Sequence, residues 1–454
     1  MNFQTVNPST EKIIATYRFF SDKTIQQKID QASSAYLSWS RLSFDERGLF
    51  LKKAAVLLEQ KKDDYAKLMT QEMGKPLGQA LSEVEKCVWG LKFIADKAAD
   101  WLVPEIVQTE ATKTYVSFDP LGTVLGIMPW NFPFWQVIRA AGSILMAGNT
   151  FLVKHSPNTT GCVLALEEVF KKAGFPPGVF QALLIPEAKV EKIIAHPTIA
   201  GITLTGSPRA GRAVASLAGA HLKKCVLELG GSDAYVILED ANLEEASYLC
   251  VNARMNNAGQ TCIAAKRFIL VGHHKKEFEK YVVEKMSRKK MGDPLDPHTN
   301  MGPMARSDLR KNLHRQVQKS IKAGARCLLG GQLPQGVGFY YPPTVLTGVS
   351  KDMPAYSEEL FGPVAVIFYA KNEKEAIKLA NDTSYGLGAC VIGKDINHAE
   401  KVAKQMEAGN CFVNTAVKSD PRLPFGGIKN SGFGRELGVF GTREFVNVKT
   451  MYVR

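Results

Sequence analysis

Residues 201–231 read GITLTGSPRAGRAVASLAGAHLKKCVLELGG, and this stretch decides the fold class. The apolar run 201–204 predicts a strand, the apolar spacing over 209–218 predicts a helix, and 224–228 predicts a second strand. A helix that crosses between two short strands is typical of a mostly parallel sheet. The turn after the first strand opens the helix, so its backbone N–H groups could meet a pyrophosphate, although the usual Gly-x-Gly-x-x-Gly fingerprint is absent.

The alternation of strands and helices continues on both sides of this stretch. Before it we expect packed helices over 24–73 and 77–101, and a β-rich, hairpin-like excursion over 116–128. The remaining predicted elements are strands at 150–154, 178–184, 267–271 and 364–369, and helices at 160–173, 188–195, 244–258, 275–289, 305–323 and 373–380. The pattern predicts an α/β protein with a nucleotide-binding type of architecture.

Length and composition bound the protein's class. A chain of 454 residues exceeds what one hydrophobic core serves, so two large domains are expected. The net charge of +13 is spread along the chain and suits an anionic cofactor and substrate, although an incidental solubility effect explains it equally well. No aromatic-basic motif supports nucleic-acid binding. Without a secretory signal or a run of about eighteen apolar residues, we expect a cytosolic protein with no membrane partner.

The eight cysteines are scattered, with no Cys-x-x-Cys pair and no spacing that suits a metal. We interpret them as free thiols, mostly small core residues. Cys262 differs because Gly259-Gln260-Thr261 precedes it, which gives it a flexible and polar setting. A thiol in such a setting is a candidate nucleophile, provided that its surroundings favour the thiolate.

Three islands of sequence together supply the groups for covalent chemistry on a carbonyl. Cys262 offers the thiol, Glu228 at a strand end offers a carboxylate base, and Asn131 between two prolines offers an amide donor for an oxyanion. The backbone N–H of Cys262 can be the second donor. Alone, Glu228 is better explained as a solvated strand end and Asn131 as the tip of a rigid turn. Their combination favours an enzyme.

At this point the chain resembles the aldehyde dehydrogenase superfamily along nearly its whole length. The matching motifs, in order, are Pro-Trp-Asn-Phe-Pro (129–133), Thr-Gly-Ser (205–207), Glu-Leu-Gly-Gly (228–231), Gly-Gln-Thr-Cys (259–262), Glu-Glu-Leu-Phe-Gly-Pro (358–363) and Pro-Phe-Gly-Gly (424–427). The resemblance implies a Rossmann-type cofactor domain (1–101 and 121–230), a catalytic domain (231–426) and a β oligomerisation flap (102–120 and 440–454). It implies that Cys262, Glu228 and Asn131 are the nucleophile, the base and the oxyanion donor.

The resemblance also implies a cofactor site. Lys154 and Glu359 are expected to hold ribose hydroxyls, Ser207 to meet the pyrophosphate and Phe361 to pack near the nicotinamide. Further residues expected to bind cofactor are Gly206, Gly211, Trp130 and Leu229. Relatives that prefer NAD often carry a glutamate three residues after the lysine, whereas this chain has Pro157. Without that carboxylate a 2′-phosphate is not repelled, so we expect NADP to be accepted and NAD also used.

Within the superfamily the likeness is to short bacterial succinate-semialdehyde dehydrogenases. Arg139 would clamp the substrate carboxylate, with Trp135 one turn before it on the same helix, and Ser419 would add a hydroxyl. Phe132 is expected to line the same substrate site. Asn256 stands where some relatives carry a second arginine, so the carboxylate clamp is thinner or built differently. Ala264 replaces the vicinal thiol that some relatives use as a redox switch.

Two groups of alternatives remain open at this stage. The enzyme could act on another small aldehyde, with Arg139 serving only as a structural ion-pair partner, or it could be a coenzyme A-dependent acylating enzyme, which Glu228 disfavours. The chain could also keep the fold without the chemistry. As partners we expect a small anionic aldehyde and further copies of the chain, in a homodimer or homotetramer.

Overall fold

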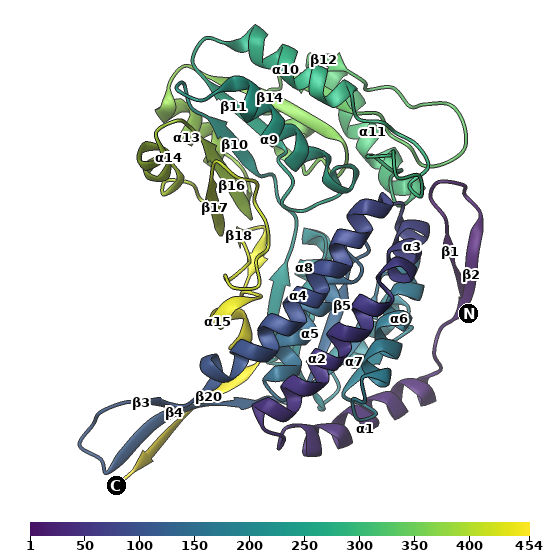
Figure 1. Ribbon diagram of the computed structural model, residues 1–454, viewed down its shortest axis with the longest axis vertical. Coiled ribbons are helices and arrows are strands. Elements are labelled where there is room, and N and C mark those ends of the chain that lie inside the picture. The colour runs from purple at the N-terminus through teal and green to yellow at the C-terminus, as the bar shows by residue number, and fades with distance from the viewer.

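The computed structural model describes residues 1–454 as two α/β lobes and a β flap (Figure 1). The lower lobe contains a six-stranded sheet in the order β19-β9-β8-β5-β6-β7. Its strands are β5 (Thr123–Met128), β6 (Thr150–His155), β7 (Phe180–Ala182), β8 (Ile199–Thr205), β9 (Lys224–Glu228) and β19 (Gly432–Phe433). The first five are mutually parallel, and only β19, from the C-terminal region, runs antiparallel to its neighbour β9. The α/β prediction is therefore confirmed.

Helices cover both faces of this sheet because alternate residues of each strand point to opposite sides. Val124 and Val153 belong to the core on the side of α5 and α6, whereas Leu125 and Leu152 belong to the core on the side of α1, α7 and α8. The helices of this lobe are α1 (Asp22–Trp39), α2 (Phe44–Gln60), α3 (Lys62–Met73), α4 (Leu77–Leu102), α5 (Trp135–Met146), α6 (Thr160–Lys172), α7 (Val190–Ile194) and α8 (Pro208–Ala220), with short turns η1 (Pro157–Thr159) and η2 (Glu187–Lys189).

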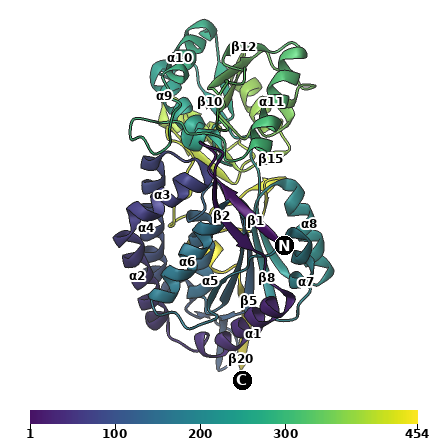
Figure 2. The ribbon, with the colours of Figure 1, turned by 90° about the vertical axis from the view of Figure 1, so that its right-hand side faces the viewer.

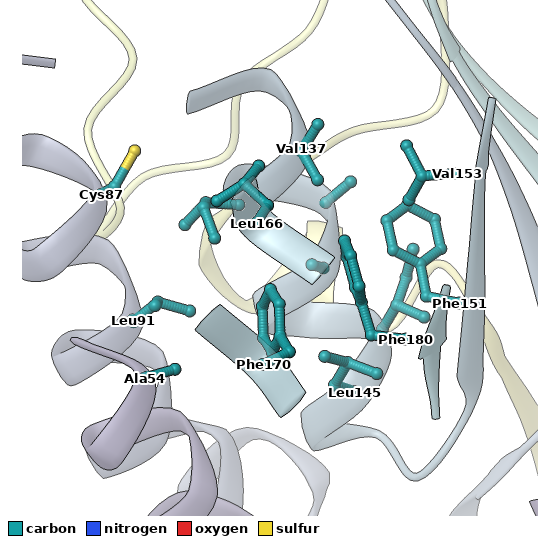
Figure 3. Close-up of a cluster of buried hydrophobic side chains, with 14 of the residues drawn as sticks. Ala54, Cys87, Leu91, Val137, Leu145, Phe151, Val153, Leu166, Phe170 and Phe180 are labelled. Atoms are coloured by element: carbon teal, nitrogen blue, oxygen red, sulfur yellow. The ribbon is translucent and has the colours of Figure 1, made fainter. Parts of the chain in front are cut away.

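In the larger of the two cores, the helices from α2 through α6 pack against the sheet (Figure 3). Phe170 stacks on Phe180 at a ring separation of 4.3 Å, and Phe151 contacts Phe180 edge-on. Each such buried side chain contributes roughly 1.5–3 kcal/mol. This packing makes the sheet a rigid base for the loops at its carboxyl edge.

The upper lobe is built on a seven-stranded sheet in the order β12-β13-β14-β11-β10-β16-β17, in which only β12 is antiparallel to its neighbour. Its strands are β10 (Ala234–Ile237), β11 (Arg267–Val271), β12 (Arg326–Leu329), β13 (Thr344–Thr347), β14 (Val364–Ala370), β16 (Gly388–Ile392) and β17 (Asn410–Val413). Its helices are α9 (Leu243–Met255), η3 (Asn256–Gly259), α10 (Lys275–Ser287), α11 (Ser307–Lys322), α12 (Pro354–Ser357), α13 (Glu373–Asn381) and α14 (Ile396–Ala403). Figure 2 shows this lobe stacked on the other.

The flap is a three-stranded sheet that projects from the lower lobe and includes the C-terminus (Figure 1). Strand β4 (Lys113–Pro120) pairs with β3 (Glu105–Ile106) on one side and with β20 (Val446–Val453) on the other. The expectation of a hairpin-like unit over 116–128 is wrong, because β5 leaves β4 and enters the parallel sheet between β6 and β8. Gly122, with a φ of 137°, lies where the chain changes sheets.

The remaining elements are small. The hairpin of β1 (Asn2–Val6) and β2 (Ile13–Arg18) precedes α1, β15 (Tyr385–Gly386) pairs with β18 (Ile428–Lys429), and α15 (Gly438–Thr442) leads into β20. No helix in the structure combines the length and the apolar character that crossing a membrane requires.

Candidate active site

The sequence motifs meet at the carboxyl edge of the parallel sheet. Asn131 follows β5, and Lys154 is the second-last residue of β6. Ser207 follows β8, and Glu228 is the last residue of β9. The chain order along the sheet reverses between β5 and β8, and ligands of open α/β sheets bind outside the strand ends at such a switch point. Cys262 comes from the upper lobe, on the loop between η3 and β11.

The loop that carries Cys262 is held in an unusual backbone conformation. Asn257, Ala258 and Gly259 all have positive φ, at 53°, 50° and 73°. Left-handed backbone at a residue other than glycine costs of order 1–3 kcal/mol and persists only where the surroundings enforce it. The buried guanidinium of Arg254 does so by donating to the carbonyls of Gly259 and, across the loop, Gly362. Sequence reasoning missed Arg254, because a charged residue near the end of a helix normally faces solvent.

The side-chain amide and the backbone carbonyl of Asn131 are both hydrogen-bonded to this loop. Its Nδ2 donates to the carbonyl of Gln260 at 3.1 Å, and its own carbonyl accepts from Asn257 Nδ2 at 2.9 Å. The amide has two N–H donors, so one remains available. The backbone N–H of Cys262 has no acceptor within the protein. An oxyanion site requires two such free donors, and the hydrogen bond to Gln260 holds Asn131 against the loop that carries Cys262.

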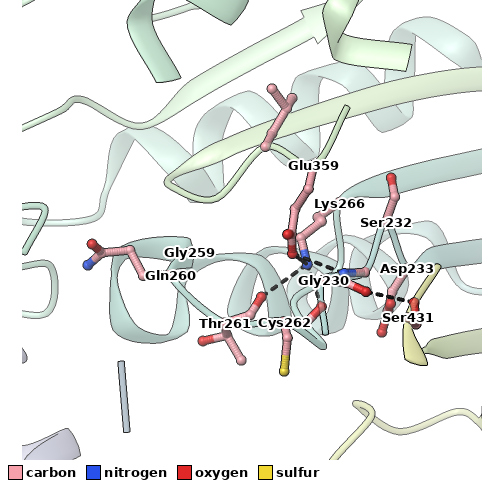
Figure 4. A network of polar contacts seen from close by, with 12 residues as sticks. Gly230, Ser232, Asp233, Gly259, Gln260, Thr261, Cys262, Lys266, Glu359 and Ser431 are labelled. Carbon is pink, nitrogen blue, oxygen red and sulfur yellow. Dashed lines mark hydrogen bonds and ion pairs between the residues drawn. The ribbon is translucent and has the colours of Figure 1, made fainter. Parts of the chain in front are cut away.

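The charged groups around Cys262 act on its thiol in opposite directions. Burial raises the pKa of Cys262 to about 12; Lys266 and Arg139 oppose this, and Glu359 and Glu228 add to it. Lys266 donates to the carbonyls of Thr261 and Cys262 and pairs with Glu359 at 3.3 Å (Figure 4). The thiol is therefore protonated at neutral pH, and Lys266 is the cation that most favours the thiolate. No motif in the sequence identified Lys266.

The carboxyl group of Glu228 is buried and has no hydrogen-bond partner. Its side chain is 2% exposed, and neither carboxylate oxygen has a hydrogen-bond partner. Burial raises its pKa well above the usual range; Arg139 opposes the shift and Glu436 adds to it. The solvated strand-end alternative for Glu228 is therefore wrong. Once ionised, a carboxylate in such surroundings is a strong base.

The residues expected at the cofactor site lie around the same strand ends. Ser207 is the N-cap of α8 and accepts from the N–H of Ala210 at 3.3 Å, and a Cβ added at Gly206 would be in ordinary contact with Leu204 at 3.6 Å. Gly211 has a different role, because a Cβ there would lie 2.6 Å from Leu229. Its absence lets α8 pack closely against the residue after β9.

The other expected cofactor residues are ordered by protein contacts. Lys154 is buried, and burial lowers its pKa, with Glu187 partly opposing the shift. Glu359 accepts from the N–H of Gly231 at 3.1 Å in addition to its pair with Lys266 (Figure 4). The ring of Trp130 meets that of Phe361 edge-on at 5.8 Å.

The expected substrate residues lie on and around α5, which begins at Trp135, two residues after Pro133. Its N-terminus is bound by Glu83 Oε1, which accepts from the N–H groups of Phe134 and Trp135, both at 3.0 Å. Phe132 lies under the ammonium of Lys75, 3.7 Å from the ring centroid, and that ammonium pairs with Glu83.

Arg139 does not stand free as a clamp in this structure. Its Nε forms a buried ion pair with Glu436, and its guanidinium lies 4.9 Å from the ring centroid of Phe425. Ser419 instead accepts from Trp135 Nε1 at 3.0 Å and from Lys86 Nζ at 2.8 Å. Sequence reasoning missed both Glu436 and Lys86. Nothing in a single sequence joins these distant positions.

Comparison with known proteins agrees with this geometry. The model of the aldehyde dehydrogenase family matches residues 1–451. A protein of Synechocystis described as a probable NADP-dependent succinate-semialdehyde dehydrogenase is 47% identical over 453 residues, with all of both chains covered. A succinate semialdehyde dehydrogenase of Escherichia coli described as using NAD or NADP is 43% identical, covering 99% of this chain and 97% of its own.

Among solved structures, succinic semialdehyde dehydrogenase of Streptococcus pyogenes in complex with NADP+ superimposes with a TM-score of 0.97. Its sequence is 35% identical, and 99% of each chain is covered. The full-length match, the two-lobed fold and the meeting of Cys262, Glu228 and Asn131 agree with one another. The chain belongs to the aldehyde dehydrogenase family.

Proposed function

We propose that this enzyme oxidises succinate semialdehyde to succinate with NADP, and also with NAD, through a covalent intermediate on Cys262. The observation that carries the proposal is the meeting of a thiol, a dry carboxyl group and a free amide donor from three distant parts of the chain. The full-length relatives that bear the succinate-semialdehyde name support the substrate. Glu228 disfavours the coenzyme A-dependent alternative, because it equips the site to use water.

The residues at the strand ends fit a dinucleotide. We assign the pyrophosphate to the N-terminus of α8 at Gly206 and Ser207, because helix N-termini present backbone N–H groups to anions. Lys154, a buried cation with no ion pair, suits a ribose hydroxyl or a nearby phosphate, and Glu359 suits the second ribose. Trp130, Gly211, Leu229 and Phe361 shape the wall beside them. Pro157 at the start of η1 places no carboxylate against a 2′-phosphate.

In the first half of the reaction, Cys262 attacks the aldehyde carbon as a thiolate, which Lys266 and Arg139 favour. The carbonyl oxygen becomes an oxyanion and accepts hydrogen bonds from the free N–H of Asn131 and the backbone N–H of Cys262. A nicotinamide bound at the strand ends would supply the oxidation, as the acceptor of the hydride that leaves the same carbon. The carbonyl then re-forms, which leaves a thioester on Cys262.

In the second half, water releases the product. Ionised Glu228 takes a proton from water as the oxygen attacks the thioester carbon, the carbon–sulfur bond breaks, and Cys262 leaves as the thiolate. Asn131 and the Cys262 N–H stabilise the oxyanion of this step as well. Because burial raises the pKa of Glu228 well above its usual range, the carboxyl group must first lose a proton, so turnover increases as pH rises.

We place the carboxylate end of the substrate beside Trp135, Ser419, Arg139 and Phe132. These residues come together near α5. The guanidinium of Arg139 supplies a positive charge there and is paired with Glu436. Charge-assisted hydrogen bonds are worth roughly 1.5–3 kcal/mol each, so an uncharged aldehyde would bind less well.

We also propose a homodimer or homotetramer in the cytosol, with the boundaries of the cofactor domain, catalytic domain and flap as predicted from the sequence. The flap strands expose the apolar side chains of Ile106, Val448 and Tyr452, which are 76%, 62% and 52% exposed. Such apolar surface on projecting strands suits association with another copy. Eight free cysteines suit a reducing compartment.

The direct test is turnover of succinate semialdehyde beside butanal, an uncharged aldehyde of similar length, with NADP and with NAD. The proposal predicts a kcat/KM at least about tenfold higher for the semialdehyde, and a higher value with NADP than with NAD. Equal values for both aldehydes would leave an aldehyde dehydrogenase of another substrate.

A further inference from the structure

Lys86 on α4 is a half-buried cation without an acidic partner at ion-pair distance. Its ammonium donates to Ser419 Oγ at 2.8 Å and lies 4.5 Å from the ring centroid of Trp135. Two lysines near the site have such a partner, Lys75 with Glu83 and Lys266 with Glu359, whereas Lys86 does not. An ammonium removed from water without a counter-ion is costly, so the position of Lys86 needs an explanation.

The hydroxyl of Ser419 has a donor to spare. Its oxygen accepts from Lys86 Nζ at 2.8 Å and from Trp135 Nε1 at 3.0 Å, which uses both of its lone pairs. Its own O–H donates to no group in the protein. The ammonium of Lys86 likewise has three N–H donors, and only one of them donates to Ser419. The cluster therefore presents unused donors and no unused acceptor.

The acidic groups near Lys86 are already engaged elsewhere. Asp420 accepts two hydrogen bonds from the guanidinium of Arg422, at 2.8 and 2.6 Å, and Glu83 pairs with Lys75. Burial and then the neighbouring Arg139 lower the pKa of Lys86 to about 8. A bound anion would satisfy the unused donors and offset the surplus positive charge.

We propose that Lys86, together with the O–H of Ser419, binds the distal carboxylate of the substrate and so determines the preference for an acidic aldehyde. The inference rests on the proposed function, and it assigns the main contact with the substrate carboxylate to Lys86 in place of Arg139. The guanidinium of Arg139 is already paired with Glu436, whereas the ammonium of Lys86 has no ion-pair partner and has free N–H donors beside α5. The structure assigns to Trp135 the task of holding Ser419 and Lys86 in register.

The test compares Lys86→Met with the wild type on succinate semialdehyde and butanal, with NADP at saturation. Lys92→Met is the matched control, because Lys92 lies on the same helix but pairs with Glu59 on the surface at 3.0 Å. The expected result is a KM for succinate semialdehyde raised roughly 10- to 100-fold by Lys86→Met, with kcat and the butanal constants within about twofold. Lys92→Met leaves both substrates unchanged.

Ser419→Ala and the pH dependence of the wild type give two further readouts. Ser419→Ala should raise the same KM several-fold without affecting butanal. The kcat/KM ratio of the semialdehyde to butanal should fall as pH rises through about 8, because protonated Lys86 binds the carboxylate and neutral Lys86 does not. The groups that surround Lys86 are Arg139, Glu83, Cys87 and Asp420, and the ratio cancels effects that are common to both aldehydes.

Two outcomes would overturn the inference. One is a Lys86→Met variant that retains the wild-type preference for the semialdehyde; the other is an equal loss on both aldehydes, which would make Lys86 a structural support for Trp135. If Lys86→Met does not fold, a wild-type ratio that is flat between pH 7 and 9 overturns it instead. Failure of the proposed function looks different, because the wild type itself would then show no preference between the aldehydes.

Discussion

At the scale of single residues, the chemistry depends on how far burial shifts two pKa values. The thiol of Cys262 and the carboxyl group of Glu228 are both more stable uncharged, because each lies away from water. Lys266 is the cation that most favours the thiolate, and it is anchored by the carbonyls of Thr261 and Cys262. The reactivity of Cys262 is thus set by a residue four positions along the chain from it.

Lys266→Met should slow alkylation of Cys262. Losing the cation raises the pKa of the thiol further, so a smaller fraction is thiolate at any pH below it; a rise of one unit gives about a tenfold slower reaction. The measurement is the rate of iodoacetamide labelling at Cys262 between pH 7 and 9, read by mass spectrometry. Glu359→Gln should have the opposite effect, because Glu359 raises the same pKa. Equal rates in all three proteins would contradict this account.

The ion pair of Arg139 and Glu436 makes a separate prediction about stability. Both side chains are buried, so Glu436→Gln leaves a guanidinium without its counter-charge, at a cost of roughly 3–5 kcal/mol. The midpoint of thermal unfolding should fall by several degrees. Glu59→Gln, which breaks an exposed pair with Lys92, should change stability by no more than about 1 kcal/mol. Similar midpoints for the two variants would show that the buried pair is not structural.

At the scale of elements, the sequence predicted best what local patterns determine. The strands β6, β9 and β11 and the helix α8 lie within two residues of their predicted bounds, because apolar runs and periodic spacing are local signals. β10 was missed, although it is the central strand that pairs with β11 and β16. Its four residues follow Gly-Gly-Ser-Asp and are too short to stand out. The pairing of β4 with β20 depends on distant residues and cannot be inferred from spacing.

The same limit applies to the site. Cys262, Glu228 and Asn131 could be identified from their local setting. The neighbours that set their properties, Lys266 among them, required the fold. Lys86 and Ser419 illustrate this most clearly, because they lie 333 positions apart and form one hydrogen bond.

Pro157→Glu should reverse the preference for cofactor. Pro157 opens η1, which is separated from β6 only by Ser156, so a carboxylate there would lie near the expected ribose. Two like charges about 4 Å apart repel by about 4 kcal/mol at an effective dielectric near 20, so the NADP-to-NAD ratio of kcat/KM should fall at least about a hundredfold. Pro157→Ala tests the loss of proline alone and should keep the wild-type ratio. An unchanged ratio in Pro157→Glu would place the ribose elsewhere.

At the scale of the whole molecule, the two lobes provide different parts of one site. The lower lobe supplies Asn131, Glu228 and the strand ends that fit the cofactor, and the upper lobe supplies Cys262 and Glu359. The Arg254 contacts fix the nucleophile loop within the upper lobe, whereas the hydrogen bond from Asn131 to Gln260 joins the lobes. The flap lies away from this site and is available for association.

Val448→Asp should produce smaller assemblies. Val448 lies on β20 and is 62% exposed, so a buried interface there would have to desolvate the new carboxylate. Sedimentation velocity should show the wild type as a dimer or tetramer and the variant as a smaller species. A wild type that sediments as a monomer, or a variant of unchanged size, would contradict the role given to the flap.

The covalent intermediate is the central claim, and trapping it is the most direct measurement. Glu228→Gln, mixed with NADP and succinate semialdehyde, should release about one equivalent of NADPH per subunit and then turn over roughly 10²–10⁴ times more slowly than the wild type. Peptide mass spectrometry should find a succinyl group on Cys262. A variant that retains wild-type turnover, or one that releases NADPH without any adduct on Cys262, would contradict the account.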